Sequence, residues 1–165
     1  MMRLVYGRYT PTGNAAMAKW VARRISYVDD GQEHPFGPCE CVGVERDRRL
    51  IACVVFNMWD PLSRTLTCSM AASTPMWARP TTVLDILDIP FRTLQARKLY
   101  TMIRSDNTRV IKLNKHLGFK EEGRLSEHFG PRLHAVVLAM KRHHYDRLRE
   151  RLGEHRQGRG RAAAA

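Results

Sequence analysis

Residues 99–125 constrain the fold of this chain most, because they predict a strand, a helix and a second strand in immediate succession. The first five of these residues, LYTMI, are apolar and β-prone, which favours a strand. Ser105, Asp106 and Asn107 then offer side chains suited to a turn and a helix cap, and apolar residues follow at helical spacing. Gly118 stands where a left-handed residue ends many helices. The segment therefore predicts strands over residues 99–103 and 119–125, with a helix over residues 108–116 between them.

The remaining sequence predicts further elements on both sides of this segment. Strands are expected at residues 3–6, 39–44, 50–59, 64–73 and 134–140, where apolar and β-branched residues gather. The charged residues 45–49 are expected to join two of these strands as a hairpin. Residues 10–13 predict a turn, residues 29–38 predict a loop, and residues 74–80 predict a break that contains two prolines.

Two helices are expected before residue 99 and a third near the C-terminus. The first is predicted to be capped by Asn14 and to bury an apolar face. The second is predicted to be capped by Thr81 and to be kinked or shortened by Pro90. The third is a charged helix over residues 142–152. The apolar face expected for the first helix consists of Ala16, Trp20, Val21 and Ile25.

The composition is that of a globular protein with one domain. The chain has 165 residues, of which 44% are hydrophobic and 27% charged. We expect residues 1–146 to form this domain and residues 147–165 to form a basic tail, partly helical and then disordered. No apolar run reaches the length of a membrane span, and the N-terminal residues lack the apolar core of a signal peptide. We therefore expect a cytoplasmic protein that makes no contact with a membrane.

The four cysteines favour free thiols over a metal site. Cys39 and Cys41 are followed by Cys53 and Cys68, a spacing that matches no common zinc motif. The sequence therefore predicts no metal. Cys68 has no identified histidine partner and is interpreted as a core residue rather than a nucleophile.

The net charge makes an anionic partner a serious hypothesis. The formal charge is +12 and the isoelectric point is near 10.2. Residues 141–161 contain eight Lys or Arg residues against three Asp or Glu residues, so +5 of this charge is local. Weak, non-specific binding of nucleic acid is therefore one expected property.

The order of strand, Asn107, short helix, Leu117-Gly118-Phe119 and an acidic pair before Gly123 resembles the C-terminal half of the GCN5-related N-acetyltransferases. Within that family it looks most like the branch that acetylates ribosomal-protein N-termini and its bacterial and phage relatives. The resemblance implies an α+β fold, with a central, mostly antiparallel sheet flanked by helices. It also implies the use of acetyl-CoA as acetyl donor.

The resemblance assigns the cofactor site residue by residue. In this family, backbone N–H groups at a strand-to-helix turn hold the pyrophosphate, because a helix start carries partial positive charge. The corresponding turn here has no glycine, and Pro80 within it cannot donate a hydrogen bond. Arg79 adds a positive charge that suits a phosphate. The residues expected to bind acetyl-CoA are Ser69, Ala71, Trp77, Ala78, Arg79, Thr81, Thr82 and Asn107.

The catalytic groups are less well defined by the resemblance. Many members carry a tyrosine that protonates the departing thiolate, and that position is Asn114 here. Backbone N–H groups of residues 69–72 are expected to polarise the acetyl carbonyl. No single general base stands out, and the candidates we prefer are His34 and His128. The other candidates are Glu40, Glu45 and Asp60.

Two functions follow from these observations. The first is an N-acetyltransferase that passes the acetyl group from acetyl-CoA directly to an amine in a ternary complex. Its acceptor would be a protein N-terminus or a small molecule. The alternative is a phage-type protein, associated with DNA or with virions, that uses the same scaffold without acetyl-CoA chemistry. The sequence does not distinguish the acceptors, nor does it give an oligomeric state.

Overall fold

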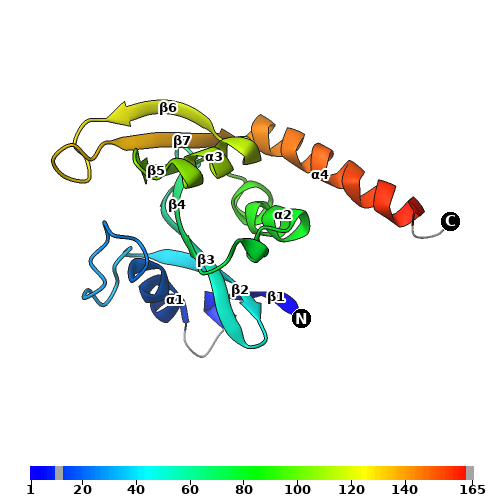
Figure 1. Cartoon of the computed structure of the whole chain (residues 1–165), viewed down its shortest axis with the longest axis horizontal. Helices are drawn as coiled ribbons and strands as arrows, with labels where there is room; N and C mark the ends of the chain where they lie inside the picture. The colour runs from blue at the N-terminus through cyan, green and yellow to red at the C-terminus, as the bar shows by residue number, and fades with distance from the viewer. Residues whose placement is uncertain (10–12, 163–165) are drawn as a thin grey trace. The chain divides into compact units, whose positions relative to one another are not determined.

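The computed structural model describes the backbone of residues 1–9 and 13–162, and side chains up to residue 153. The chain divides into two compact units, Met1–Thr82 and Val83–Ala165. The first unit holds strands β1 (Met2–Tyr6), β2 (Cys39–Arg46), β3 (Arg49–Asp60) and β4 (Thr65–Ala72), with helix α1 (Gly13–Ala22) (Figure 1). The second holds strands β5 (Lys98–Arg104), β6 (Lys120–Leu125) and β7 (Ala135–Lys141), with helices α3 (Thr108–Leu117) and α4 (Arg142–Ala162). Helix α2 (Pro80–Asp88) spans the boundary. The predicted α+β class is confirmed.

The strands of the first unit form an antiparallel sheet in the order β1-β2-β3-β4. Gly43 on β2 lies opposite Val5 on β1 and Cys53 on β3. The turn between β2 and β3 places Asp47 and Arg48 in the left-handed region, with φ of 51° and 62°. Two such residues match the twist of the flanking strands. The predicted hairpin is confirmed, with a tighter turn than expected.

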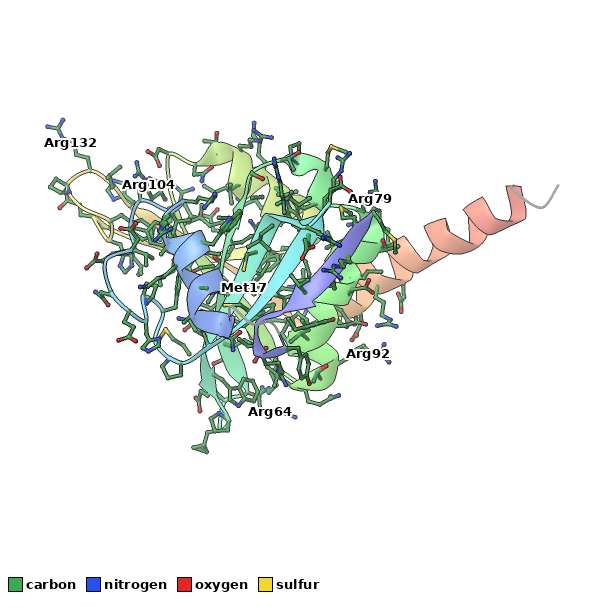
Figure 2. All side chains as sticks on the ribbon, turned by 90° about the horizontal axis from the view of Figure 1, so that it is seen from below. Met17, Arg64, Arg79, Arg92, Arg104 and Arg132 are labelled. Atoms are coloured by element: carbon green, nitrogen blue, oxygen red, sulfur yellow. The ribbon has the colours of Figure 1, made fainter. Side chains whose placement is uncertain are left out.

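Helix α1 buries a different face from the one predicted. Its buried residues are Met17, Ala18, Val21 and Ala22. The helix ends at Ala22, so Ile25 lies outside it. Ala16 is exposed and Trp20 is only half-buried. Met17, Ala18 and Val21 pack on side chains of the sheet, and Figure 2 labels Met17 on this helix. The sheet supplies Cys41, Cys53, Val55 and Ala71 to this core.

Asn14 does not cap α1 as predicted. The helix already includes Gly13, and the Asn14 Oδ1 atom accepts a hydrogen bond from the Cys41 N–H at 2.8 Å. Strand β1 ends opposite Val42, so this side chain supplies an acceptor where the β1–β2 register ends. The turn predicted at residues 10–13 lies mostly outside the described residues.

The second unit confirms the local signals around α3. Strands β5, β7 and β6 pair antiparallel in that order. The Asn107 side chain caps α3 by accepting from the Val110 N–H at 3.3 Å. Gly118 ends the helix with a φ of 104°. Helix α3 nevertheless has no buried residue, so its apolar face is only partly covered.

All six residues of strand β6 are exposed, and the contacts of its side chains are ion pairs rather than buried apolar contacts. A register shift after Glu121 leaves Glu122 as an extra residue, which is a β-bulge. Lys98 and Lys141 lie directly opposite each other on β5 and β7, and such like-charge pairs are unfavourable. Glu122 contacts both, at 2.9 Å and 3.5 Å. The bulge therefore places a carboxylate between two lysines that would otherwise repel each other.

Helix α4 continues to Ala162, beyond the predicted end at residue 152. Tyr145 stacks on Phe91 with ring centroids 4.8 Å apart, and its hydroxyl donates to Asp88. Leu148 is also buried, and Arg149 pairs with Asp88. The part of the helix that packs on the second unit therefore reaches residue 149 at least. Among the described residues, none of the helices has the length and apolar character of a membrane span.

Candidate functional site

The connection between β4 and α2 is compact although it lacks glycine. The Thr74 side chain accepts a hydrogen bond from the Met76 N–H at 3.4 Å. The Ala78 N–H donates to the Pro75 carbonyl at 3.1 Å, and the Arg79 N–H donates to the Trp77 carbonyl at 2.8 Å. Trp77 is buried. The backbone of this turn therefore uses several of its own N–H groups internally, and those of the following helix start are the ones left for a ligand.

Helix α2 starts at Pro80, so the prediction that Thr81 caps it is wrong. Proline suits the first helical position, because its fixed φ is helical and the N–H it lacks would have no partner within the helix. Thr81 and Thr82 follow, and their N–H groups precede the first bond within the helix. The first turn has no acidic residue that would offset its partial positive charge.

Arg79 is the charged residue next to this helix start. Its side chain is exposed, and Figure 2 labels it at the α2 end. Within the described part of the chain, no carboxylate forms an ion pair with it. An exposed guanidinium beside a helix N-terminus is a combination that favours a phosphate group. The residues present therefore fit the pyrophosphate of acetyl-CoA, despite the missing glycine.

Strand β4 carries Ser69 and Ala71, which lie opposite Val55 and Cys53 on β3. Ala71 is buried in the core beneath α1, and Ser69 is half-buried on the same face of the strand. The residue that sequence reasoning missed here is Tyr27. It follows α1 in the chain and forms a side-chain hydrogen bond with Ser69. Burial raises the pKa of Tyr27, and the hydrogen bond with Ser69 opposes that shift.

No local pattern singles out Tyr27, because its role depends on a partner more than forty residues later in the chain. A tyrosine hydroxyl with an ordinary pKa of about 10 already keeps its proton at neutral pH. Tyr27 is therefore suited to donate a proton rather than to accept one.

The two asparagines of interest lie in the second unit, Asn107 at the N-cap of α3 and Asn114 within that helix. The Asn107 Oδ1 atom caps the helix, which leaves its amide nitrogen as a separate donor. The Asn114 Nδ2 atom donates to the Val110 carbonyl at 2.9 Å. Asn114 is thus engaged by its own helix, and a carboxamide is in any case too weak an acid to protonate a thiolate.

The candidate bases differ in how they are held. His34 lies in the loop before β2 and His128 in the loop between β6 and β7, and both are exposed. His128 contacts the Phe129 ring edge-on at 4.8 Å between centroids. For neither ring does the described structure show a carboxylate partner that would orient it. They lie in different units, and both remain predictions.

The carboxylate candidates each have charged or polar partners. Glu40 pairs with Arg8 at 2.9 Å, and Glu45 pairs with Arg3 at 3.1 Å. The pKa of Asp60 is lowered by hydrogen bonds, first from the Ser63 hydroxyl and then from the Leu62 N–H. The Asp60 carboxylate therefore takes up a proton less readily.

The four cysteines are free thiols on strands. The Sγ atoms of Cys39 and Cys41 lie 3.9 Å apart on β2. Burial raises the pKa of Cys68 to about 12, which disfavours the thiolate that a nucleophile requires. In the part of the chain that the structure describes, no three His, Cys, Asp or Glu side chains are arranged to hold a metal ion.

Comparison with solved structures identifies the fold. A variant of the spermidine N-acetyltransferase from Vibrio cholerae is similar to this chain with a TM-score of 0.70, at 18% identity over 87% of this chain and 95% of that one. The same enzyme in a dodecameric structure gives a TM-score of 0.68, at 20% identity over 87% of this chain and 95% of that one. The chain has the GCN5-related N-acetyltransferase fold.

A further crystal structure, provisionally assigned as an acetyltransferase, gives a TM-score of 0.70 at 15% identity over 93% of each chain. No protein-family model and no curated protein sequence matches this chain. The expected fold is therefore confirmed, whereas a particular branch of N-acetyltransferases is not supported. Because a fold can host unrelated activities, the function has to be argued from the site.

Proposed function

We propose that this protein is an N-acetyltransferase that transfers the acetyl group of acetyl-CoA directly to an amine. The observation that carries this proposal is the start of α2, where Arg79 and two threonines stand at an uncompensated helix N-terminus at the end of the connection from β4. Acetyltransferases of this fold are the solved structures that the chain resembles over nearly its whole length.

Acetyl-CoA, when bound, supplies an acetyl thioester. The N–H groups of Thr81 and Thr82, with the Arg79 guanidinium, would hold its pyrophosphate. Trp77 and Ala78 would line the same turn. Three further proposed contacts come from elsewhere in the chain: the backbone at Ser69 and Ala71 on β4 would polarise the acetyl carbonyl, and Asn107 would donate its amide nitrogen to the cofactor.

Transfer requires two proton movements besides bond exchange at the carbonyl. The acceptor ammonium must lose a proton to a base, for which His34 and His128 are proposed. The free amine then forms a bond to the carbonyl carbon while the carbon–sulfur bond breaks. The nitrogen loses its second proton to give the neutral amide, and the departing thiolate takes up one proton, so the charges balance. Tyr27 is proposed as the donor of that proton, because its hydroxyl is protonated at neutral pH and is hydrogen-bonded to Ser69 on β4. Asn114 cannot fill this role.

The acceptor is proposed only as an amine, either a protein N-terminus or a small molecule. Spermidine is the first compound to test, because the similar solved structures are spermidine N-acetyltransferases. A small amine and a peptide N-terminus should be compared side by side.

The test measures cofactor binding and acetyl transfer separately. Acetyl-CoA at 100 times its Kd should stabilise the folded protein by about 2.7 kcal/mol, seen as a rise in melting temperature. Arg79→Ala should weaken binding about tenfold or more in calorimetry, since a hydrogen bond to a charged group is lost. Arg97→Ala, which also removes an exposed arginine, is the matched control and should leave the affinity unchanged.

Thiol release from acetyl-CoA should then depend on an added amine. A well-folded sample that shows no thermal response to millimolar acetyl-CoA would remove the cofactor from the proposal. Binding without transfer to spermidine, to other amines or to a peptide N-terminus would remove the activity.

The alternative, a scaffold for nucleic acid, finds less support in α4. Three arginines in the described part of this helix are engaged within the second unit. Arg142 donates to the Gln95 side chain at 2.6 Å, Arg149 pairs with Asp88, and Arg151 donates to the His116 carbonyl at 3.1 Å. Duplex binding that falls steeply with salt, together with no response to acetyl-CoA, would favour this alternative.

A further inference from the structure

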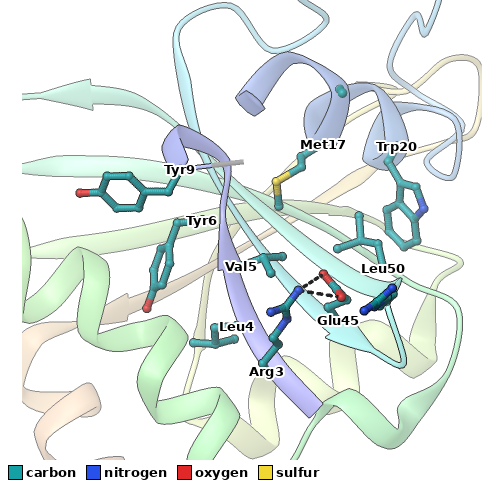
Figure 3. Close-up of a pocket in the computed structure, with 11 residues that line it drawn as sticks. Arg3, Leu4, Val5, Tyr6, Tyr9, Met17, Trp20, Glu45 and Leu50 are labelled. Carbon is teal, nitrogen blue, oxygen red and sulfur yellow. Dashed lines mark hydrogen bonds and ion pairs between the residues drawn. The ribbon is translucent and has the colours of Figure 1, made fainter. Parts of the chain in front are cut away.

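An open groove of about 660 Å³ lies in the first unit, along strand β1. Its walls come from β1, from Tyr9 just after it, from α1 and from the β2–β3 hairpin (Figure 3). None of the residues proposed to bind acetyl-CoA lines it.

The groove follows the edge of a sheet. Strand β1 is the first in the strand order, and within the described residues it pairs only with β2. Its consecutive residues 3–6 all line the groove. Leu4, Val5 and Tyr6 are only half-buried, so the edge presents apolar side chains to solvent. Along an edge strand, alternate N–H and C=O groups point outward without a partner, which makes it a template for another strand.

One side-chain subsite is built around a glycine. A Cβ atom on Gly43 would lie 2.4 Å from Leu50, 2.8 Å from Met17 and 2.9 Å from Val5. The absence of a side chain at Gly43 lets the ends of these three residues converge next to the β1 edge, as Figure 3 shows for the labelled Val5, Met17 and Leu50. The resulting wall is apolar and suits an apolar or aromatic side chain.

The charge of the groove favours an acidic occupant. Glu45 is the acidic residue of the lining, and Arg3 neutralises it with two hydrogen bonds, at 3.1 Å and 3.3 Å. In the same hairpin, Asp47 pairs with the N-terminal amine. Arg48 also lines the groove, and the described residues provide no carboxylate partner for it or for Arg49. A second copy of this chain would bring the same positive charge to the edge, which disfavours self-association.

We propose that this groove binds an acidic, extended peptide of a partner protein as an added strand beside β1. Main-chain hydrogen bonds to the strand edge would supply affinity, and alternate side chains would supply specificity. An antiparallel addition continues the pattern of β1 to β4. In that direction, one peptide side chain lies beside Val5. The side chain two residues later in the peptide lies beside Arg3 and reaches Arg48. The recognised pattern is therefore an apolar residue, any residue, then Asp or Glu.

The probe is the fluorescein-labelled peptide Ser-Thr-Ser-Thr-Phe-Thr-Glu-Thr-Ser, measured by fluorescence anisotropy on the full chain. The first control exchanges the Phe and the Glu, which keeps the composition and reverses the order. The second replaces the Thr between them with Pro, which removes an N–H and restricts the backbone. We expect saturable binding of the probe, and binding at least about tenfold weaker for each control. Equal binding of the three peptides would show simple charge attraction and overturn the proposal.

The protein variants test the charged subsite. Arg48→Glu should weaken binding of the probe about tenfold, and a peptide with Lys in place of Glu should recover affinity for this variant. Arg49→Glu is the matched control, because Arg49 is adjacent but does not line the groove, and it should change the affinity less than twofold. Circular dichroism and melting temperature check that each variant is folded. An equal effect of the two variants would overturn the assignment to Arg48.

Other occupants would also be recognised. Analytical ultracentrifugation should show that the protein is a monomer. A dimer that Arg48→Glu abolishes would show that the groove binds a second copy of this chain instead. If phenylacetate displaces the peptide with an equal affinity, the groove is a binding site for a small apolar acid instead. Either result, or the absence of binding to the probe, overturns the proposal.

Discussion

Removing the Tyr145 hydroxyl should destabilise the second unit by an amount that its hydrogen bonds predict. Tyr145 is 1% exposed, stacks on Phe91 and donates to Asp88. In Tyr145→Phe the ring can stay in place while the bond to the carboxylate is lost. A hydrogen bond to a charged group contributes about 1.5–3 kcal/mol. Asp88 keeps Arg149 at 2.9 Å and Arg92 at 3.3 Å, so its carboxylate is not left unpaired.

We therefore expect the lower end of that range, about 1.5 kcal/mol, from Tyr145→Phe. For a chain of this length, that corresponds to a fall in melting temperature of about 3–6 °C. Chemical denaturation followed by circular dichroism gives the free energy directly. Arg149→Ala is the comparison: its guanidinium pairs with Asp88 and also donates to the Tyr145 hydroxyl at 2.9 Å, and because both charged side chains are partly exposed the pair should contribute less than about 1 kcal/mol.

A double-mutant cycle with Asp88→Asn separates the bond from the packing of the ring. If Tyr145→Phe is as destabilising in the Asp88→Asn background as in the wild type, the hydroxyl does not act through Asp88. A loss below about 0.5 kcal/mol in the wild type would equally refute the reasoning.

Three further results are expected. The side chains of Arg124 and Lys115 lower the pKa of Glu121 to about 2. The charged Glu121 should therefore stabilise the folded protein above pH 4.5, and this contribution should be lost as the pH falls toward 2. The difference in unfolding free energy between wild type and Glu121→Gln should close over that range. Gly118→Ala should destabilise by about 1 kcal/mol or more because of the left-handed φ, and a change as small as that of the control Gly123→Ala would contradict this. Tyr27→Phe should lower kcat while leaving KM for acetyl-CoA nearly unchanged, and an unaltered kcat in a steady-state assay would exclude it as the proton donor.

The elements around α3 could be predicted because their signals are local. The Asn107 cap and the left-handed Gly118 act within a few residues of the helix ends, where side-chain type alone decides the geometry. The start of α2 could not be placed as well. Thr81 is a good cap by composition, but Pro80 before it suits the first helical position and moves the helix start forward.

The errors in α1 have a different origin. Its apolar residues fit more than one face, and which face is buried depends on the sheet beneath it. Asn14 could serve as a cap, yet it bonds to Cys41, 27 residues later. The contact of Tyr27 with Ser69 is likewise long-range. In the candidate site, the strand-to-helix turn was therefore predictable from a resemblance, whereas the proposed proton donor needed the tertiary structure.

The bulge at Glu122 has a consequence for how β6 responds to its surroundings. No side chain of this strand is buried, so the hydrophobic effect does little to fix its register. Counter-ions at high salt would screen Glu122 from its two lysines and weaken the contacts that accompany the bulge. The backbone amides of β6 should then exchange with deuterium faster as ionic strength rises, while those of β7, with most of its side chains buried, should change little. Ionic strength should thus change the local stability of strand β6 without changing that of the buried strand β7 beside it.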